Sequence, residues 1–387
     1  MLAAPASTEV TKMGYYRWAF VTVLLLVSST GRLFAQQPIP WHDPSPHTVQ
    51  FVTVDENVNL EVLDWGGSGR PLVLLAGLGN TAHVFDDFAP KLTPEYHVYG
   101  ITRRGYGASS APASGYSADQ RGDDVLAVLD ALKINRPVLV GHSIAGDELS
   151  SVGTRHPERV AGLIYLDAAY SNSFYDRSLG NVDLDSRALQ KKLDQMRTAS
   201  TPLEHKRLVE ELVQVDLPDL EKELRELLKL LQSEPSQPVS PPAASQDDLA
   251  NFPALRAYVA RVRGINFPES ELRQTHESRP DGGVGKPLPG RGDAISEGEQ
   301  KYSDIRLPVL AFFANPRDPA PYAYNTPAER ATFEALQTAA IEAQAKAFET
   351  DVPSARVVRV PHANHYVFLS NESDVLREMR AFLAGLH

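Results

Sequence analysis

The chain has 387 residues, enough for two or three average domains or for one large α/β domain. Its 42% hydrophobic and 22% charged residues are typical of a globular protein and exclude the disordered and polytopic membrane classes. The formal charge of -11 argues against nucleic acid as a partner, because the phosphate backbone is also negative. The chain contains no cysteine, which excludes disulfides, thiolate nucleophiles and cysteine-ligated zinc.

Residues 1–35 have the pattern of an export signal. Lys12 and Arg17 precede an apolar run at residues 18–27, and small residues follow towards a cleavage site near Ala35. A run of this length is about half of what a helix needs to cross a bilayer. We therefore expect a cleaved signal peptide, a periplasmic or secreted protein and no stable membrane span after cleavage. A retained, uncleaved segment is the alternative.

The part that follows alternates short apolar runs with helical patterns. A hairpin is expected at residues 47–54 and 58–66, where apolar and polar residues alternate. Continuous apolar runs predict buried parallel strands at residues 71–77, 97–105, 137–143 and 163–169. Helical spacing of apolar residues follows at residues 118–132 and 144–154. This alternation predicts an α/β fold, with a mostly parallel sheet covered by helices on both faces.

Strand patterns are absent between residues 171 and 300. Leu-rich and charged stretches predict helices at residues 184–231, with an interruption at Pro218, and at 248–262. Residues 203–231 could pair as a coiled coil, but we expect a cap helix that lines a pocket. Residues 280–293 are rich in Gly and Pro and predict a loop.

Strands are again predicted at residues 307–314 and 355–361, with helices at 327–350 and 372–383. The expected organisation is therefore a sheet core at residues 36–170 and 301–387, with a helical cap inserted at residues 171–300.

The segment Gly141-His142-Ser143-Ile144-Ala145-Gly146 lies where a predicted strand meets a predicted helix. A tight turn at this point requires small neighbours and exposes the serine hydroxyl, which makes Ser143 a candidate nucleophile. A serine that only caps the helix is the alternative.

A serine hydroxyl needs a base to accept its proton, and imidazole is the usual one. His365 follows the last predicted strand and is the favoured base, with His362 as the alternative. The base needs a carboxylate to orient it. Asp318, after the strand at residues 307–314, is favoured over Asp167, which follows an earlier strand. Asp147 and Glu148 are closer in sequence, but their position fits the start of the helix after Ser143.

An oxyanion formed during acyl transfer needs two backbone N–H donors. We expect one from Ile144, directly after Ser143, and one from Leu78, which lies between two glycines. A plain glycine turn is the alternative for the second position. Phosphate-binding glycine loops and metal-ligand spacings are absent from the sequence.

Five segments resemble the α/β-hydrolase superfamily in their order and spacing. They are LLAGLGN at 74–80, ITRRGYGAS at 101–109, VGHSIAG at 140–146, the turn at Asp318, and ANHYVF at 363–368. The resemblance covers residues 48–170 and 301–386. It implies an α/β-hydrolase fold with a variable helical cap, serine-dependent hydrolysis, and neither metal nor cofactor. Ala76, Thr102 and Ala145 depart from the family pattern.

Carried over to this chain, the resemblance implies that Ser143 is the nucleophile, His365 the base and Asp318 the orienting acid. It implies an oxyanion hole formed by Leu78 and Ile144. The expected activity is that of a carboxylesterase that cleaves a small to medium apolar ester. Two alternatives stay open: cleavage of a carbon-carbon or amide bond by the same residues, and a ligand-binding protein that uses the scaffold without catalysis.

Overall fold

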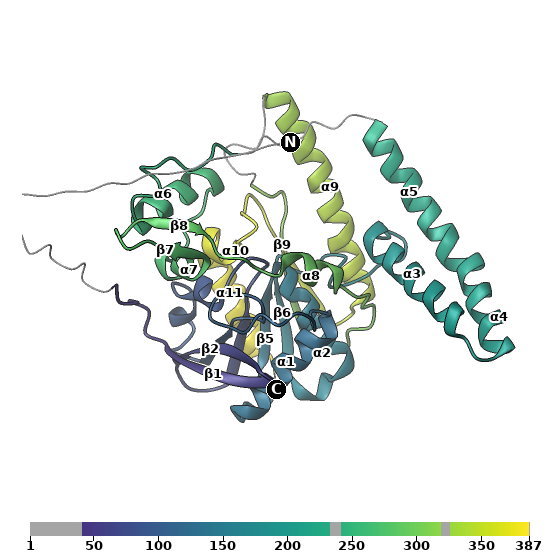
Figure 1. Cartoon of the computed structure of the whole chain (residues 1–387), viewed down its shortest axis with the longest axis horizontal. Helices are drawn as coiled ribbons and strands as arrows, with labels where there is room; N and C mark the ends of the chain where they lie inside the picture. The colour runs from purple at the N-terminus through teal and green to yellow at the C-terminus, as the bar shows by residue number, and fades with distance from the viewer. Residues whose placement is uncertain (1–40, 233–240, 319–325, 387) are drawn as a thin grey trace, which may run out of the picture. The chain divides into compact units, whose positions relative to one another are not determined.

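The computed structural model describes residues 41–232, 241–318 and 326–386, so the signal segment expected at residues 1–35 lies outside the described residues (Figure 1). Its centre is an eight-stranded sheet in the order β1-β2-β4-β3-β5-β6-β9-β10. The strands are β1 (Thr48–Asp55), β2 (Val58–Gly66), β3 (Pro71–Leu75), β4 (His97–Ile101), β5 (Val138–His142), β6 (Gly162–Leu166), β9 (Val309–Ala314) and β10 (Ala355–Val360).

The expected mixture of one hairpin and a parallel sheet is confirmed. β2 pairs antiparallel with both β1 and β4. The pairs from β4 through β10 are all parallel, so the carboxyl ends of these strands share one edge of the sheet. Side chains that come directly after β5, β6, β9 and β10 are thereby brought close together.

Apolar side chains cover both faces of the sheet. In β3, Leu72 and Leu74 point to one face and Val73 to the other, and all three are fully buried. The first face packs against α11 (Glu372–Ala384). The second packs against α1 (Ala118–Ala131), α2 (Gly146–Arg155) and α9 (Pro327–Asp351). Burial on two sides explains why these strands are continuous apolar runs.

The chain between β6 and β9 is mainly helical. Its helices are α3 (Val182–Thr198), α4 (Pro202–Glu211), α5 (Leu217–Gln232), α6 (Phe252–Arg263), α7 (Glu269–Thr275) and α8 (Gly292–Glu297). A small hairpin, β7 (His276–Ser278) and β8 (Val284–Pro287), occupies part of the segment expected to be a loop. These strands are too short to produce an alternating pattern. The cap boundaries at residues 171 and 300 stay a prediction.

Pro218 does not interrupt the helix in which it lies, contrary to the prediction. A π-turn at Leu212–Asp216 precedes it, and the Leu217 N–H bonds to the Leu212 carbonyl. Pro218 therefore lies inside one continuous helical stretch, Pro202–Gln232, directly after a π-turn that locally changes the backbone hydrogen-bond pattern. The break in the helical stretch lies earlier, between Thr198 and Pro202.

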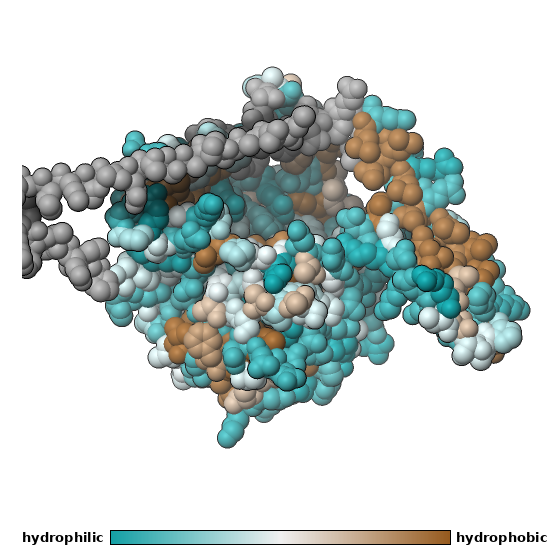
Figure 2. Space-filling model, in the orientation of Figure 1, coloured by the Kyte–Doolittle hydropathy of each residue, from teal (hydrophilic) through white to brown (hydrophobic). Residues whose placement is uncertain are grey.

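α5 exposes a stripe of apolar side chains. Four leucines of α5 are each between 46% and 58% exposed: Leu217, Leu224, Leu228 and Leu231. Figure 2 shows hydrophobic surface at the place of α5 in Figure 1. The prediction that this stretch lines a pocket is therefore wrong for these leucines. No helix in the described ranges is both long and apolar enough to span a membrane.

Candidate active site

Ser143 lies at the sharp turn between β5 and α2. Its φ of +55° is in the left-handed region, which is rare for a residue with a side chain. Glycines leave the space that this turn needs. A Cβ at Gly141 would lie 2.6 Å from a Leu149 methyl, and one at Gly146 would lie 2.2 Å from the Ala168 carbonyl oxygen. The turn therefore places Ser143 at the carboxyl edge of the sheet, as the strand-to-helix pattern predicts.

His365 reaches Ser143 from the turn after β10. Its Nε2 lies 2.9 Å from Ser143 Oγ, and its Nδ1 lies 2.6 Å from Asp167 Oδ2. The alternative base, His362, is exposed and donates its backbone N–H to the Pro316 carbonyl instead. The expected contact between Ser143 and His365 is thus present, and their chemical roles stay predictions.

The carboxylate beside His365 belongs to Asp167, so the prediction that Asp318 orients the imidazole is wrong. The Asp318 side chain is exposed, and its backbone N–H donates to the Ala363 carbonyl at 2.8 Å. The order of the sheet explains the difference. β6 lies directly beside β5, so Asp167, one residue beyond β6, emerges next to Ser143.

Asp167 is fully buried and is held by four donors. Besides His365, its carboxylate accepts hydrogen bonds from the Ala314 amide at 2.9 Å, from Arg317 at 2.6 Å and from the Tyr170 hydroxyl. Burial alone would raise the pKa of Asp167. The hydrogen bond from His365 and the charge of Arg317 outweigh burial and hold that pKa below its ordinary value.

The ionised Asp167 fixes the tautomer of His365. A carboxylate only accepts hydrogen bonds, so the Nδ1 that faces it must carry a proton. In the neutral imidazole, Nε2 is then an acceptor, and the Ser143 hydroxyl donates to it at 2.9 Å. This is the arrangement needed to take a proton from Ser143.

A second histidine, His142, supports the main chain of His365. Its ring is fully buried, and its Nε2–H donates to the His365 carbonyl at 3.1 Å. Burial and the nearby His365 lower the pKa of His142 well below its ordinary value, so this ring stays neutral. His142 therefore acts as packing and support next to the Ser143–His365 pair.

The turn at Gly77–Asn80 lies against Ser143, because a Cβ at Gly77 would come within 3.3 Å of Ser143 Cβ. Arg103 donates to the carbonyls of Ala76 and Gly77 at 2.5 and 2.9 Å. In a trans peptide the C=O and the following N–H point in opposite directions, so the Leu78 amide is turned away from Arg103. This orientation fits the expected oxyanion donor at Leu78.

Ile144 is the second residue of the helical turn Ser143–Ala145, which precedes α2. The first N–H groups of such a segment have no acceptor within the helix, which leaves this amide free for a ligand.

The two acidic residues near the start of α2 form ion pairs that stabilise the fold. Asp147 pairs with Arg121 and Glu148 with Arg103, each at 2.8 Å.

Glu271 of α7 holds the other end of the Gly77–Asn80 turn. It accepts hydrogen bonds from the Asn80 side chain at 2.8 Å and from the Thr81 hydroxyl at 2.5 Å. Asn80 in turn accepts from the Tyr366 hydroxyl at 2.9 Å, next to His365. Burial raises the pKa of Glu271 to about 7, against the opposing effect of these hydrogen bonds.

A cavity of about 1140 Å³ begins at this turn. Gly79, Asn80 and Tyr106 line it on one side, and Tyr106 packs near Ile144. Most of the remaining wall is apolar and comes from α6, α7 and the chain around them, including Leu255, Tyr258, Val259, Val262, Phe267 and Leu272. Its size and apolar wall suit a small organic ligand.

Sequence reasoning did not identify Arg103, Arg317, Tyr170 or Glu271 as parts of the site. Arg103 lies within the ITRRGYGAS segment and Arg317 directly before Asp318, so both were next to residues already considered. Glu271 had no local signal, because nothing in α7 indicates that it contacts a turn 190 residues away.

Comparisons with known proteins agree with this fold. The family model for the alpha/beta hydrolase fold matches residues 70–264, about half of the chain. The non-heme chloroperoxidase of Streptomyces lividans is 33% identical over 120 residues, 30% of this chain and 44% of that protein. The 2-(acetamidomethylene)succinate hydrolase of Mesorhizobium japonicum is 26% identical over 101 residues, 26% of this chain and 36% of that protein. The chain thus matches less than half the length of these relatives.

Among solved structures, E-2-(acetamidomethylene)succinate hydrolase is similar with a TM-score of 0.53 and 18% identity. The match covers 88% of this chain and all of that one. A likeness at this identity concerns the fold.

Proposed function

Because the chain belongs to the alpha/beta hydrolase fold family, we propose that it is a serine hydrolase that cleaves carboxylic esters through an acyl-enzyme at Ser143. The observation that carries this proposal is the continuous relay from Ser143 through His365 to Asp167, with separations of 2.9 and 2.6 Å. The hydroxyl, imidazole and carboxylate are the three groups that serine-dependent acyl transfer requires.

In the proposed reaction, Ser143 Oγ attacks the ester carbonyl carbon while its proton passes to His365 Nε2. The N–H groups of Leu78 and Ile144 stabilise the resulting oxyanion. Collapse of this intermediate expels the alkoxide, which takes the proton from His365. A water molecule then attacks the acyl-enzyme with His365 as base, which releases the carboxylic acid and restores Ser143.

The apolar cavity beside the Gly77–Asn80 turn supports an apolar acyl or alcohol group of small to medium size. Cleavage of a carbon-nitrogen bond by the same residues is the second candidate. It is favoured by the relative from Mesorhizobium japonicum, whose named substrate carries an acetamido group.

Labelling with a fluorophosphonate probe and a panel of p-nitrophenyl esters and anilides of matched acyl length test both candidates. Ser143→Ala should lose labelling and turnover by about 10⁴-fold or more while its melting temperature stays unchanged. Ser200→Ala, at an exposed serine between α3 and α4, is the control and should leave both unchanged. Faster turnover of anilides than of esters would favour the second candidate. Ligand binding without labelling would instead indicate a non-catalytic protein.

A further inference from the structure

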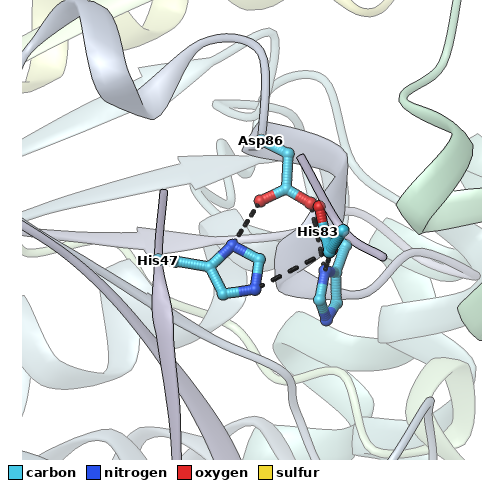
Figure 3. Close-up of side chains that lie close together, drawn as sticks. His47, His83 and Asp86 are labelled. Carbon is cyan, nitrogen blue, oxygen red and sulfur yellow. Dashed lines mark hydrogen bonds and ion pairs between the residues drawn. The ribbon is translucent and has the colours of Figure 1, made fainter. Parts of the chain in front are cut away.

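Four side chains form a largely buried cluster apart from the Ser143–His365–Asp167 relay. This His–Asp cluster consists of Asp43, His47, His83 and Asp86. One nitrogen or carboxylate oxygen from each lies within 4.8 Å of those from the other three. Asp43 and His47 come from the chain before β1, whereas His83 lies in the short helix Ala82–Phe85 and Asp86 directly follows it. Figure 3 shows the two imidazoles and the Asp86 carboxylate facing one another.

The separations within the cluster are short. His83 Nδ1 lies 3.0 Å from Asp86 and 3.4 Å from Asp43. His47 lies 2.9 Å from Asp86 through Nδ1 and 3.9 Å from Asp43 through Nε2. A tetrahedral zinc ion with bonds of 2.0–2.2 Å would hold its nitrogen and oxygen ligands about 3.4 Å apart. The cluster therefore needs only small side-chain shifts to surround such an ion.

One buried imidazole nitrogen of the cluster lacks a hydrogen bond. His47, His83 and Asp86 have side chains that are only 3–4% exposed. His47 Nδ1 and Asp86 Oδ1 form an ion pair with each other at 2.9 Å, but His83 Nε2 is buried without a hydrogen bond and lies 3.6 Å from Glu61. Buried polar atoms without a hydrogen bond are rare in native proteins and require an explanation.

The charge balance is compatible with a cation. Glu61 adds a third carboxylate, 3.6 Å from His83 Nε2. Glu61 and Asp86 are buried and Asp43 is 21% exposed, so the cluster needs compensating positive charge. A divalent ion bound to neutral imidazoles supplies the same two positive charges that two protonated imidazoles would supply.

We propose that the His–Asp cluster binds one divalent metal ion of the zinc type. Two imidazole nitrogens and two carboxylate oxygens are a ligand set that suits Zn²⁺. The ion would tie the chain before β1 to the segment that follows the Gly77–Asn80 turn, so its role is structural. The ligands form two close pairs in sequence, Asp43 with His47 and His83 with Asp86, and the two pairs are far apart along the chain, so neither pair by itself indicates a metal site. This proposal does not depend on the chemistry at Ser143.

The test uses the full chain, expressed without a polyhistidine tag and stripped of metal with a chelator. Competition with a chromophoric chelator gives the Zn²⁺ affinity, elemental analysis gives the stoichiometry, and the melting temperature is recorded with and without Zn²⁺. We expect one Zn²⁺ per chain and a higher melting temperature when it is bound. Replacement by Co²⁺ should give the absorption spectrum of a tetrahedral site.

Asp43→Asn and His83→Gln should each weaken Zn²⁺ binding on the order of 100-fold and abolish the thermal shift. Asp43 is 21% exposed, so its variant is expected to fold. His97→Gln is the matched control, because it breaks another histidine-aspartate pair, the 2.8 Å contact with Asp64. Binding that is undetectable in the wild type, or equally strong in both cluster variants, would overturn the proposal.

Discussion

Arg317 and His365 contact the same carboxylate oxygen of Asp167, each at 2.6 Å. Arg317 comes from the turn after β9, where the sequence suggested the acid itself. This turn therefore contributes a cation, Arg317, which holds the Asp167 carboxylate in place. The carboxylate is supplied by the neighbouring strand β6.

Asp167→Asn should lower kcat by about 10⁴-fold, because an amide in place of the carboxylate can hold the wrong tautomer of the imidazole. Asp318→Asn should stay within about threefold of the wild type, since that side chain is exposed. Turnover of a p-nitrophenyl ester by both variants checks this, with circular dichroism to establish that each is folded. A larger loss of turnover in Asp318→Asn than in Asp167→Asn would instead identify Asp318 as the orienting acid.

Arg317→Met should destabilise the protein by on the order of 3 kcal/mol near neutral pH, because it leaves the buried Asp167 charge without its cation. The depressed pKa of Asp167 stabilises the folded state above the ordinary Asp pKa of about 3.9. That stabilisation is lost as the pH falls through the depressed value.

The difference in melting temperature between wild type and Arg317→Met should therefore be largest above about pH 5 and should shrink as the pH falls below about 4. Arg306→Met is a suitable control, because Arg306 pairs with Asp304 at the surface. A difference that stays constant from pH 3 to pH 8 would contradict a role through the Asp167 charge.

The sheet and the main helices could be predicted because their signals are local. The inner parallel strands β3, β5, β6 and β9 are buried on both faces, so each is a short apolar run, and the Ser143 turn is marked by its small neighbours. By contrast, the β7–β8 hairpin has strands of only three and four residues, which produce no pattern. The sequence predicted a break at Pro218, but the helix continues through it after a π-turn at Leu212–Asp216. No residue type marks a π-turn, so the sequence could not indicate it.

The choice between Asp167 and Asp318 could not be made from sequence, because both follow predicted strands at the same edge of the sheet. It depends on which strand lies beside β5, and strand order is a tertiary property. Glu271 illustrates the same limit, since its contact with Thr81 joins α7 to a segment 190 residues earlier in the chain.

Gly77→Ala should lower kcat by about 100-fold with little change in KM. An added Cβ would lie 2.7 Å from His142 Nδ1 and 3.3 Å from Ser143 Cβ, so the turn that presents the Leu78 amide must move. Loss of one oxyanion donor has an effect of about this size. Steady-state kinetics on the preferred ester provide the measurement.

Gly79→Ala is the control for this substitution. A Cβ at Gly79 meets no atom within 4 Å, but its φ of +79° makes any side chain strained by about 1 kcal/mol. Gly79→Ala should therefore lower the melting temperature, and its loss of turnover should be much smaller than that of Gly77→Ala. Equal losses of turnover in the two variants would show that the clash at Gly77 is not responsible.

Glu271→Gln should stabilise the protein at pH 8 and leave it almost unchanged at pH 5. Burial raises the pKa of Glu271 from 4.5 to about 7, so between these values the folded state keeps a proton that the unfolded chain releases. Stability therefore falls as the pH rises through this window and levels off above it. The full effect is about 3 kcal/mol, and glutamine, which is neutral throughout, removes it.

Melting curves of wild type and Glu271→Gln from pH 5 to pH 8 measure this effect. Glu269→Gln, on the same helix, is the control, because the Glu269 carboxylate pairs with Arg273 at 2.6 Å and should show no gain with rising pH. A gain of equal size at pH 5 and pH 8 would mean that the substitution acts through packing. A gain that grows with pH would instead show that α7 holds the Asn80–Thr81 segment with a carboxyl group that is protonated below neutral pH.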